Sequence, residues 1–163
     1  TDMPTGEPGE IVVRGYTIMA GSLDDPDATA EAIDADGWLR TGDIGVMDKA
    51  GNIDITDRKK DMFIVGGFNA YPAEIENLML ALDTVGQVAV VGTPDDRLGE
   101  VGVAFVVAAS GTTVDPDELV AWSKETMANY KAPRRVVVLD ELPMNVAGNK
   151  VDREALKTQA ADG

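Results

Sequence analysis

The segment Asp54–Glu76 constrains the fold most, because charge, strand, turn and helix signals follow one another within it. A basic cluster of Arg58, Lys59 and Lys60 precedes a short apolar run, and two adjacent glycines separate that run from a helix start at Tyr71–Pro72. A strand, a permissive turn and a helix N-terminus beside positive charge are typical of a site for a phosphorylated ligand.

Strand and helix patterns alternate from residue 61 to the end of the chain. Strands are predicted at 62–65, 87–92, 101–108 (long enough to be central) and 135–139, and helices at 72–82, 115–129 and 152–159. A polar link is expected at 95–100. The stretch 110–113 resembles part of a phosphate-binding loop, but no lysine follows it, so a turn is expected there. This alternation predicts a small α+β domain in which helices flank a sheet.

The first part of the chain has a different pattern, in which short strands dominate. We predict a strand at 10–16, a short helix at 24–34 and a loop at 37–43. A hairpin is expected with arms at 44–47 and 52–56 and a turn at 48–51. The charged residues 57–60 show no periodicity and are expected to connect two units.

Net charge and missing residue types exclude several functions. The 163 residues carry a formal charge of −15, and so acidic a chain repels nucleic acid and anionic membranes. Without cysteine or histidine, disulfides, thiol nucleophiles, histidine-based triads and Cys/His metal sites are excluded, so any metal must have oxygen ligands. We expect a soluble, cytoplasmic protein without a secretory signal, and the longest apolar run, Val101–Ala109, is too short to span a membrane.

Four positions carry residues of chemical interest, and each also has an ordinary structural interpretation. Asp43 can accept two hydrogen bonds from a ribose diol, although a Thr-Gly-Asp sequence alone favours a plain turn. Arg58 can present its planar fork to ribose or phosphate, or pair with Asp57 at the surface. Gly66–Gly67 allows a ligand to approach the backbone closely, or forms a bulge or turn. Lys150 can act as a mobile charge on phosphate and carboxylate oxygens, although most single lysines are simply exposed.

The order of these motifs is more informative than any one of them. GEIVVRG, GWLRTGD, DRKKDMFIVGGFNAYPAEIE and NVAGNKVDREAL follow one another through nearly the whole chain. Together they resemble the C-terminal part of an AMP-forming acyl-CoA synthetase of the adenylate-forming superfamily, which also holds the adenylation domains of peptide synthetases and the beetle luciferases. The resemblance implies that residues 1–57 end a large, β-rich N-terminal adenylation domain, 58–60 form a hinge, and 61–163 form a mobile C-terminal domain.

The resemblance also implies a role for each candidate residue. Asp43 would bind the ribose hydroxyls of ATP and of the acyl-adenylate, with Arg58 beside it, and Lys60 would mark the hinge. Gly66–Gly67 would line the tunnel for the pantetheine of CoA after the small domain rotates. Lys150 would act in the first half-reaction, in which a carboxylic acid becomes acyl-AMP.

Two departures from the family pattern qualify these roles. The closing motif of the family usually has its lysine directly after the glycine, whereas Asn149 intervenes here and offsets Lys150 by one residue. The glycine-rich phosphate loop and the segment that holds the adenine and the metal are absent, and in the family both lie upstream. We therefore expect a fragment of a longer enzyme that is inactive alone, with the ligands of Mg²⁺ in its N-terminal part and no metal ligands in this chain.

Several alternative functions are compatible with the same motifs. The expected partners are ATP, CoA, a carboxylic acid and the N-terminal domain of the same enzyme, and a fatty or other hydrophobic acid would place it in lipid metabolism. A carrier-protein-dependent adenylation domain is one alternative, although Lys60, Pro72 and the sequence AYPAEIE look more like the CoA-dependent branch of the superfamily. Luciferase-type chemistry is another. If the chain is complete, it could instead be a non-catalytic module that binds nucleotide or CoA.

Overall fold

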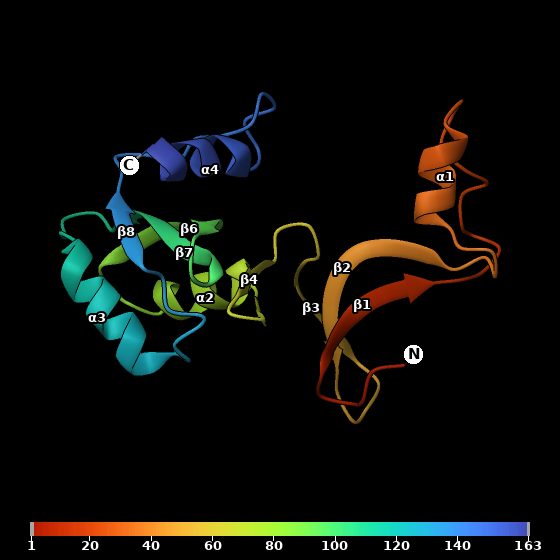
Figure 1. Cartoon of the computed structure of the whole chain (residues 1–163), viewed down its shortest axis with the longest axis horizontal. Helices are drawn as coiled ribbons and strands as arrows, with labels where there is room; N and C mark the ends of the chain where they lie inside the picture. The colour runs from red at the N-terminus through yellow and green to blue at the C-terminus, as the bar shows by residue number, and fades with distance from the viewer. Residues whose placement is uncertain (1, 163) are drawn as a thin grey trace. The chain divides into compact units, whose positions relative to one another are not determined.

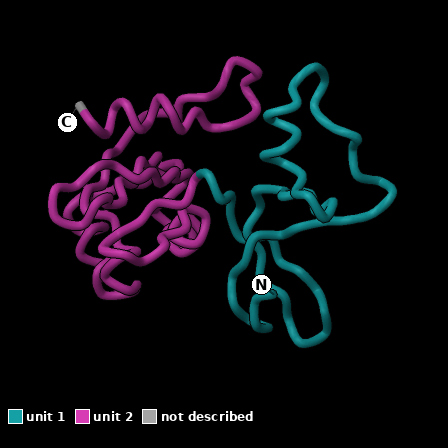
Figure 2. The backbone as a smooth tube through the Cα atoms, turned by 45° about the vertical axis from the view of Figure 1, so that its right-hand side comes forward, with its two compact units in different colours: residues 1–60 teal, residues 61–163 magenta. Residues whose placement is uncertain are grey.

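A computed structural model of the chain describes residues 2–162. The backbone divides into two units, residues 1–60 and 61–163, which Figure 2 shows in different colours. Among the described residues, no helix is both long enough and apolar enough to cross a membrane.

The first unit contains a three-stranded antiparallel sheet and one short helix. The sheet has the order β1-β2-β3, with β1 at Pro8–Val13, β2 at Leu39–Met47 and β3 at Ile53–Arg58. Helix α1 (Pro26–Ala32) begins after Asp25, whose carboxylate accepts a hydrogen bond from the Ala28 amide at 2.9 Å. The predicted hairpin is confirmed, and so is the helix, whose proline and capping aspartate are local signals. The strand predicted at 10–16 exists but begins and ends earlier, at Pro8–Val13.

The loop predicted at 37–43 is wrong, because Leu39–Asp43 belongs to β2. Glu10 and Val12 of β1 pair with Ile44 and Arg40, so three residues of β2 lie opposite the single residue between them. This is a β-bulge, and it contains Gly42 with a φ of +72°. A glycine that looks like a loop signal in the sequence therefore bends a continuous strand.

Two predicted connections are also shorter than expected. Asp57 and Arg58 belong to β3 rather than to an aperiodic link, so the charged connection starts at Lys59. The polar link predicted at 95–100 shrinks to 96–98, because the strands on either side extend into it.

The second unit is built on a five-stranded sheet with β7 (Gly99–Ala108) at its centre, as predicted. β7 pairs antiparallel with β6 and β4 and parallel with β8. The four predicted strands are confirmed, and β5, which pairs with β4, was not predicted. The other strands are β4 (Phe63–Val65), β5 (Phe68–Ala70), β6 (Val85–Asp95) and β8 (Arg135–Val138).

Helices cover both faces of this sheet (Figure 1). Ala104 and Val106 of β7 join the cluster under α2 and α3, whereas Val103 and Phe105 join the cluster that contains Leu156 of α4. Burial of each larger side chain among these, such as Phe105 or Leu156, stabilises the fold by roughly 1.5–3 kcal/mol. The predicted α+β class, with helices flanking a sheet, is confirmed. The helices are α2 (Pro72–Leu80), α3 (Pro116–Thr126) and α4 (Arg153–Asp162).

Candidate functional site

Asp43 and Arg58 form an ion pair in the first unit. They lie opposite each other in the β2–β3 register, and Arg58 Nε is 2.8 Å from Asp43 Oδ1. The Asp43 side chain is 23% exposed and that of Arg58 57% exposed, so both can still reach a ligand. A carboxylate beside a guanidinium can accept hydrogen bonds from a diol while the cation faces an anion.

The bulge in β2 positions Asp43. The Thr41 hydroxyl donates a hydrogen bond to the Ile11 carbonyl at 2.8 Å and accepts one from the Asp43 amide at 3.0 Å. The Gly42 carbonyl accepts a hydrogen bond from the Lys59 amide at 2.8 Å. These bonds hold the Thr-Gly-Asp segment to β1 and to the residue that follows β3, which gives the Asp43 carboxylate a defined direction.

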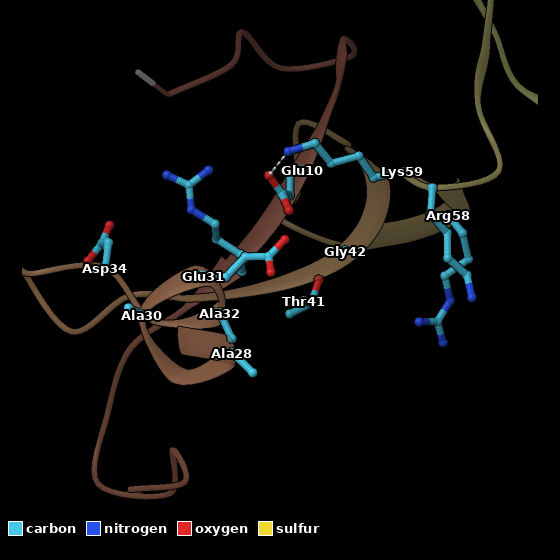
Figure 3. Close-up of a pocket in the computed structure, with 12 residues that line it drawn as sticks. Glu10, Ala28, Ala30, Glu31, Ala32, Asp34, Thr41, Gly42, Arg58 and Lys59 are labelled. Carbon is cyan, nitrogen blue, oxygen red and sulfur yellow. Dashed lines mark hydrogen bonds and ion pairs between the residues drawn. The ribbon is translucent and has the colours of Figure 1, made fainter. Parts of the chain in front are cut away.

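An open cavity of about 650 Å³ lies in the first unit, between α1 and the sheet (Figure 3). Arg58 and Lys60 line it, and Asp43 does not. Lys59, also on its wall, is paired with Glu10 at 2.8 Å. Glu10 and Arg40 line the same cavity but were not predicted, because an isolated charge has no signal in the sequence until the fold gathers it with others.

Gly66 and Gly67 form the tight turn between β4 and β5. Their φ angles are +58° and +89°, a region that favours glycine strongly. The Gly66 amide donates to the Leu98 carbonyl at 2.8 Å, whereas a Cβ on Gly67 would meet nothing within 4 Å. The turn is therefore anchored at Gly66 and open at Gly67, where another molecule could approach the backbone.

Asp95 supports that anchor from the β6–β7 connection. Its carboxylate accepts hydrogen bonds from the amides of Leu98 at 2.8 Å and Arg97 at 3.0 Å, and these bonds lower the pKa of Asp95 below its ordinary value. Because the Leu98 carbonyl holds Gly66, the Asp95 carboxylate stabilises the residue whose carbonyl fixes the glycine turn.

Phe68 directly follows the glycine turn, and it contacts an aromatic ring that lies beside a lysine. Phe68, 60% exposed on β5, stacks on Tyr130 with ring centroids 5.0 Å apart. Lys131 lies over the Tyr130 ring and contacts Glu74 at 2.5 Å. Burial lowers the pKa of Lys131, but the hydrogen bond and charge of Glu74 outweigh it, so that pKa lies above its ordinary value.

Lys150 lies at the end of a closed loop before α4. Met144 and Val151 form an antiparallel bridge, and the Asn145 amide donates to the Lys150 carbonyl at 2.8 Å. The extra residue, Asn149, is held inside the loop by a bond from its amide to the Asn145 side chain at 3.2 Å. The Lys150 side chain is exposed, whereas its carbonyl is held by the hydrogen bond from Asn145.

The structure brings only some of the candidate residues together. Asp43 and Arg58 meet in the first unit, whereas the Gly66–Gly67 turn and Lys150 are held by separate contacts in the second. No group of three or more acidic side chains within residues 2–162 could hold a metal ion.

Residues 74–149 match the family of AMP-binding enzyme C-terminal domains. The chain belongs to the adenylate-forming superfamily, and it corresponds to the C-terminal part of enzymes named as acyl-CoA ligases and synthetases. Among solved structures, it is similar to ATP-bound MatB from Rhodopseudomonas palustris, with a TM-score of 0.89, 36% identity and 98% of this chain covered. The apo structure of MatB matches with a TM-score of 0.69 at the same identity.

Curated relatives share the sequence but are much longer. The chain is 55% identical over 154 residues to the 3-[(3aS,4S,7aS)-7a-methyl-1,5-dioxo-octahydro-1H-inden-4-yl]propanoyl:CoA ligase of Rhodococcus jostii, covering 94% of this chain and 30% of that protein. It is 47% identical over 146 residues to a feruloyl-CoA synthase of an Amycolatopsis species, covering 90% of this chain and 30% of that protein. The MatB match likewise covers 32% of that chain. The chain thus spans about a third of the length of these proteins.

Proposed function

We propose that this chain is the C-terminal part of an ATP-dependent acyl-CoA synthetase, which activates a carboxylic acid as acyl-AMP and passes the acyl group to CoA. The Asp43–Arg58 pair carries the proposal. Two residues 15 positions apart, each suited to ribose or phosphate, meet at 2.8 Å beside a bulge that orients the carboxylate. Asp43 accepts hydrogen bonds from the ribose hydroxyls, and Arg58 holds that carboxylate in place.

Lys150 acts in the first half-reaction. An oxygen of the substrate carboxylate attacks the α-phosphorus of ATP, and the bond from that phosphorus to pyrophosphate breaks. Both reactants are anions, so their repulsion is the main obstacle. The Lys150 ammonium, exposed at the end of its loop, lies between carboxylate and phosphate and lowers that repulsion.

Gly66 and Gly67 act in the second half-reaction, in which the CoA sulfur attacks the acyl carbonyl and AMP leaves. Gly67 has open space where a side chain would be, so the pantetheine arm passes close to the backbone there. Lys60, the last residue of the first unit, is the hinge about which the second unit rotates. One orientation brings Lys150 to the reacting groups in the first half-reaction, and the other brings the glycine turn there in the second. The unequal match to ATP-bound and apo MatB supports a change of shape in this part of such enzymes.

The test uses the complete parent enzyme that carries this chain. Lys150→Ala is expected to reduce ATP–pyrophosphate exchange by about 100-fold or more, since a single electrostatic group is worth that much in a dry site. Thioester formation from supplied acyl-adenylate should stay within threefold. Lys157→Ala, which removes an exposed lysine paired with Glu154 in α4, is the matched control. An equal loss of both half-reactions in Lys150→Ala would contradict the two separate roles.

The relatives' names guide the choice of acid. We propose a hydrophobic acid with a ring system, because the Rhodococcus and Amycolatopsis relatives are named for a fused-ring propanoate and for feruloyl-CoA. Screening the complete enzyme with ring-bearing acids and with straight-chain fatty acids tests this. Preference for straight chains would place the enzyme in fatty-acid metabolism.

A non-catalytic binding module remains the second candidate, and isothermal titration separates the two. A C-terminal part should bind ATP poorly, since most of the nucleotide site lies outside it. Tight ATP binding by residues 1–163 alone would favour the module.

A further inference from the structure

Arg153, the first residue of α4, is joined to three other segments of the second unit. Its Nη1 donates to Glu76 Oε1 at 2.9 Å and to the Val90 carbonyl at 2.8 Å, and its Nη2 donates to Glu76 Oε2 at 3.2 Å. Its Nε lies 3.7 Å from Asp61 Oδ2. The Arg153 side chain is 25% exposed, so this forked arrangement is largely shielded from water.

Each partner belongs to a different segment of the second unit. Asp61 is the first residue of that unit and directly follows Lys60. Glu76 lies on α2, and its Oε1 also accepts a hydrogen bond from the Val90 amide of β6 at 2.8 Å. Arg153 itself lies three residues after Lys150. One guanidinium therefore connects the segment of Lys150 to the residue that follows the proposed hinge.

The other contacts of α4 and of the glycine turn do not depend on Arg153. The far end of α4 is held by Arg135, whose Nη2 donates to the Ala160 carbonyl at 2.5 Å. Leu156, fully buried, packs α4 against the sheet. The glycine turn has its own anchor in the bond from Gly66 to Leu98. Loss of Arg153 should thus affect the start of α4 and the Lys150 loop selectively.

We propose that Arg153 is a positioning residue for adenylation, which holds the Lys150 loop in a defined place relative to Asp61 at the hinge side of the second unit. Its effect on catalysis rests on the proposed function, whereas its effect on the loop does not. Lysine cannot replace it fully, because an ammonium lacks the planar fork that engages both Glu76 oxygens and the Val90 carbonyl at once.

The first arm of the test uses residues 1–163 and measures amide hydrogen exchange. In Arg153→Met, the amides of Asn145 and Asp152, which donate to the Lys150 and Pro143 carbonyls, should exchange at least tenfold faster. The Gly66 amide should stay within twofold. Arg135→Met, which removes a brace at the other end of α4, is the control and should leave Asn145 and Asp152 protected. If both variants act alike, or if exchange rises evenly through the second unit, Arg153 is a general structural brace and the proposal is overturned.

The second arm measures both half-reactions in the complete parent enzyme. Arg153→Met should lower kcat for adenylation at least tenfold with the KM for ATP within twofold, and should leave thioester formation from acyl-adenylate within threefold. Arg153→Lys keeps the positive charge and should recover part of the adenylation rate. It also serves as the test variant if Arg153→Met folds poorly. Parallel loss of both half-reactions, or no loss, would overturn the positioning role. The two arms can also disagree. If Arg153→Met speeds exchange in the loop as expected but the complete wild-type enzyme forms no adenylate from any acid, the proposed function is overturned and only the structural part of this inference stands.

Discussion

Asp43 and Arg58 lie opposite each other on β2 and β3, with Arg58 Nε 2.8 Å from Asp43 Oδ1. More than half of the Arg58 side chain is exposed, so water screens the pair and its contribution to stability is small, about 1 kcal/mol or less. A close, well-aligned pair with little effect on stability is better explained by what it presents to a ligand.

Asp43→Asn should therefore impair nucleotide binding far more than folding. In the complete enzyme we expect the KM for ATP to rise about tenfold, since a hydrogen bond to a charged group contributes roughly 1.5–3 kcal/mol. The melting temperature should hardly change. Asp54→Asn, at an exposed position of β3, is the control and should leave KM unchanged. An unchanged KM in Asp43→Asn would remove Asp43 from the ATP site.

Gly67→Ala should affect the second half-reaction alone. At its φ of +89° a side chain costs about 1–2 kcal/mol, although the new Cβ meets nothing within 4 Å. We expect thioester formation from acyl-adenylate to fall at least tenfold in the complete enzyme while adenylation is retained. Gly51→Ala is a matched control, because Gly51 has a φ of +88° and equally open surroundings on the β2–β3 turn. If both variants slowed thioester formation equally, backbone strain rather than access for CoA would be the cause.

The charge of Asp95 should make the stability of the glycine turn depend on pH. Hydrogen bonds from the Leu98 and Arg97 amides lower the pKa of Asp95 in the folded state. The stabilisation is therefore present above the unfolded pKa of about 3.9 and is lost as pH falls through the lower, folded value. Asp95→Asn keeps an acceptor oxygen but no charge, so the wild type should be the more stable at pH 7. Denaturant midpoints of the two should converge by about pH 2–3; a constant gap would contradict this account.

Gly92→Ala should destabilise the second unit through overpacking. A Cβ on Gly92 would run into the Cβ and ring of Phe63, which is 1% exposed and has little room to shift. We expect a loss of about 1–3 kcal/mol in the free energy of unfolding, measured by urea denaturation. The substitution Phe63→Leu in the same chain should not restore that loss, because leucine keeps the Cβ and Cγ atoms that the new methyl group meets. An alanine variant as stable as the wild type would show that Phe63 relocates freely.

Local signals explain why most elements could be predicted. Pro26, Pro72 and Pro116 each begin a helix, and Asp25 and Asp115 cap two of them, as the sequence indicates. By contrast, β5 was missed, because its three residues follow two glycines and the strand exists only by pairing with β4. Gly42 misled the prediction for the same reason, since whether a glycine ends a strand or bends it depends on the partner strand.

The sequence by itself determined the α+β class, the kinds of elements, and the family motifs that contain Asp43, Arg58, Gly66–Gly67 and Lys150. Their chemistry depends on residue type and on order along the chain, both of which are local. Only the tertiary structure decided that Arg58 pairs with Asp43, that Leu98 holds the glycine turn, and that Arg153 joins α4 to Glu76 and Asp61. Those contacts arise from strand register and from helix packing on the sheet, which are set by burial of the whole core rather than by neighbouring residues.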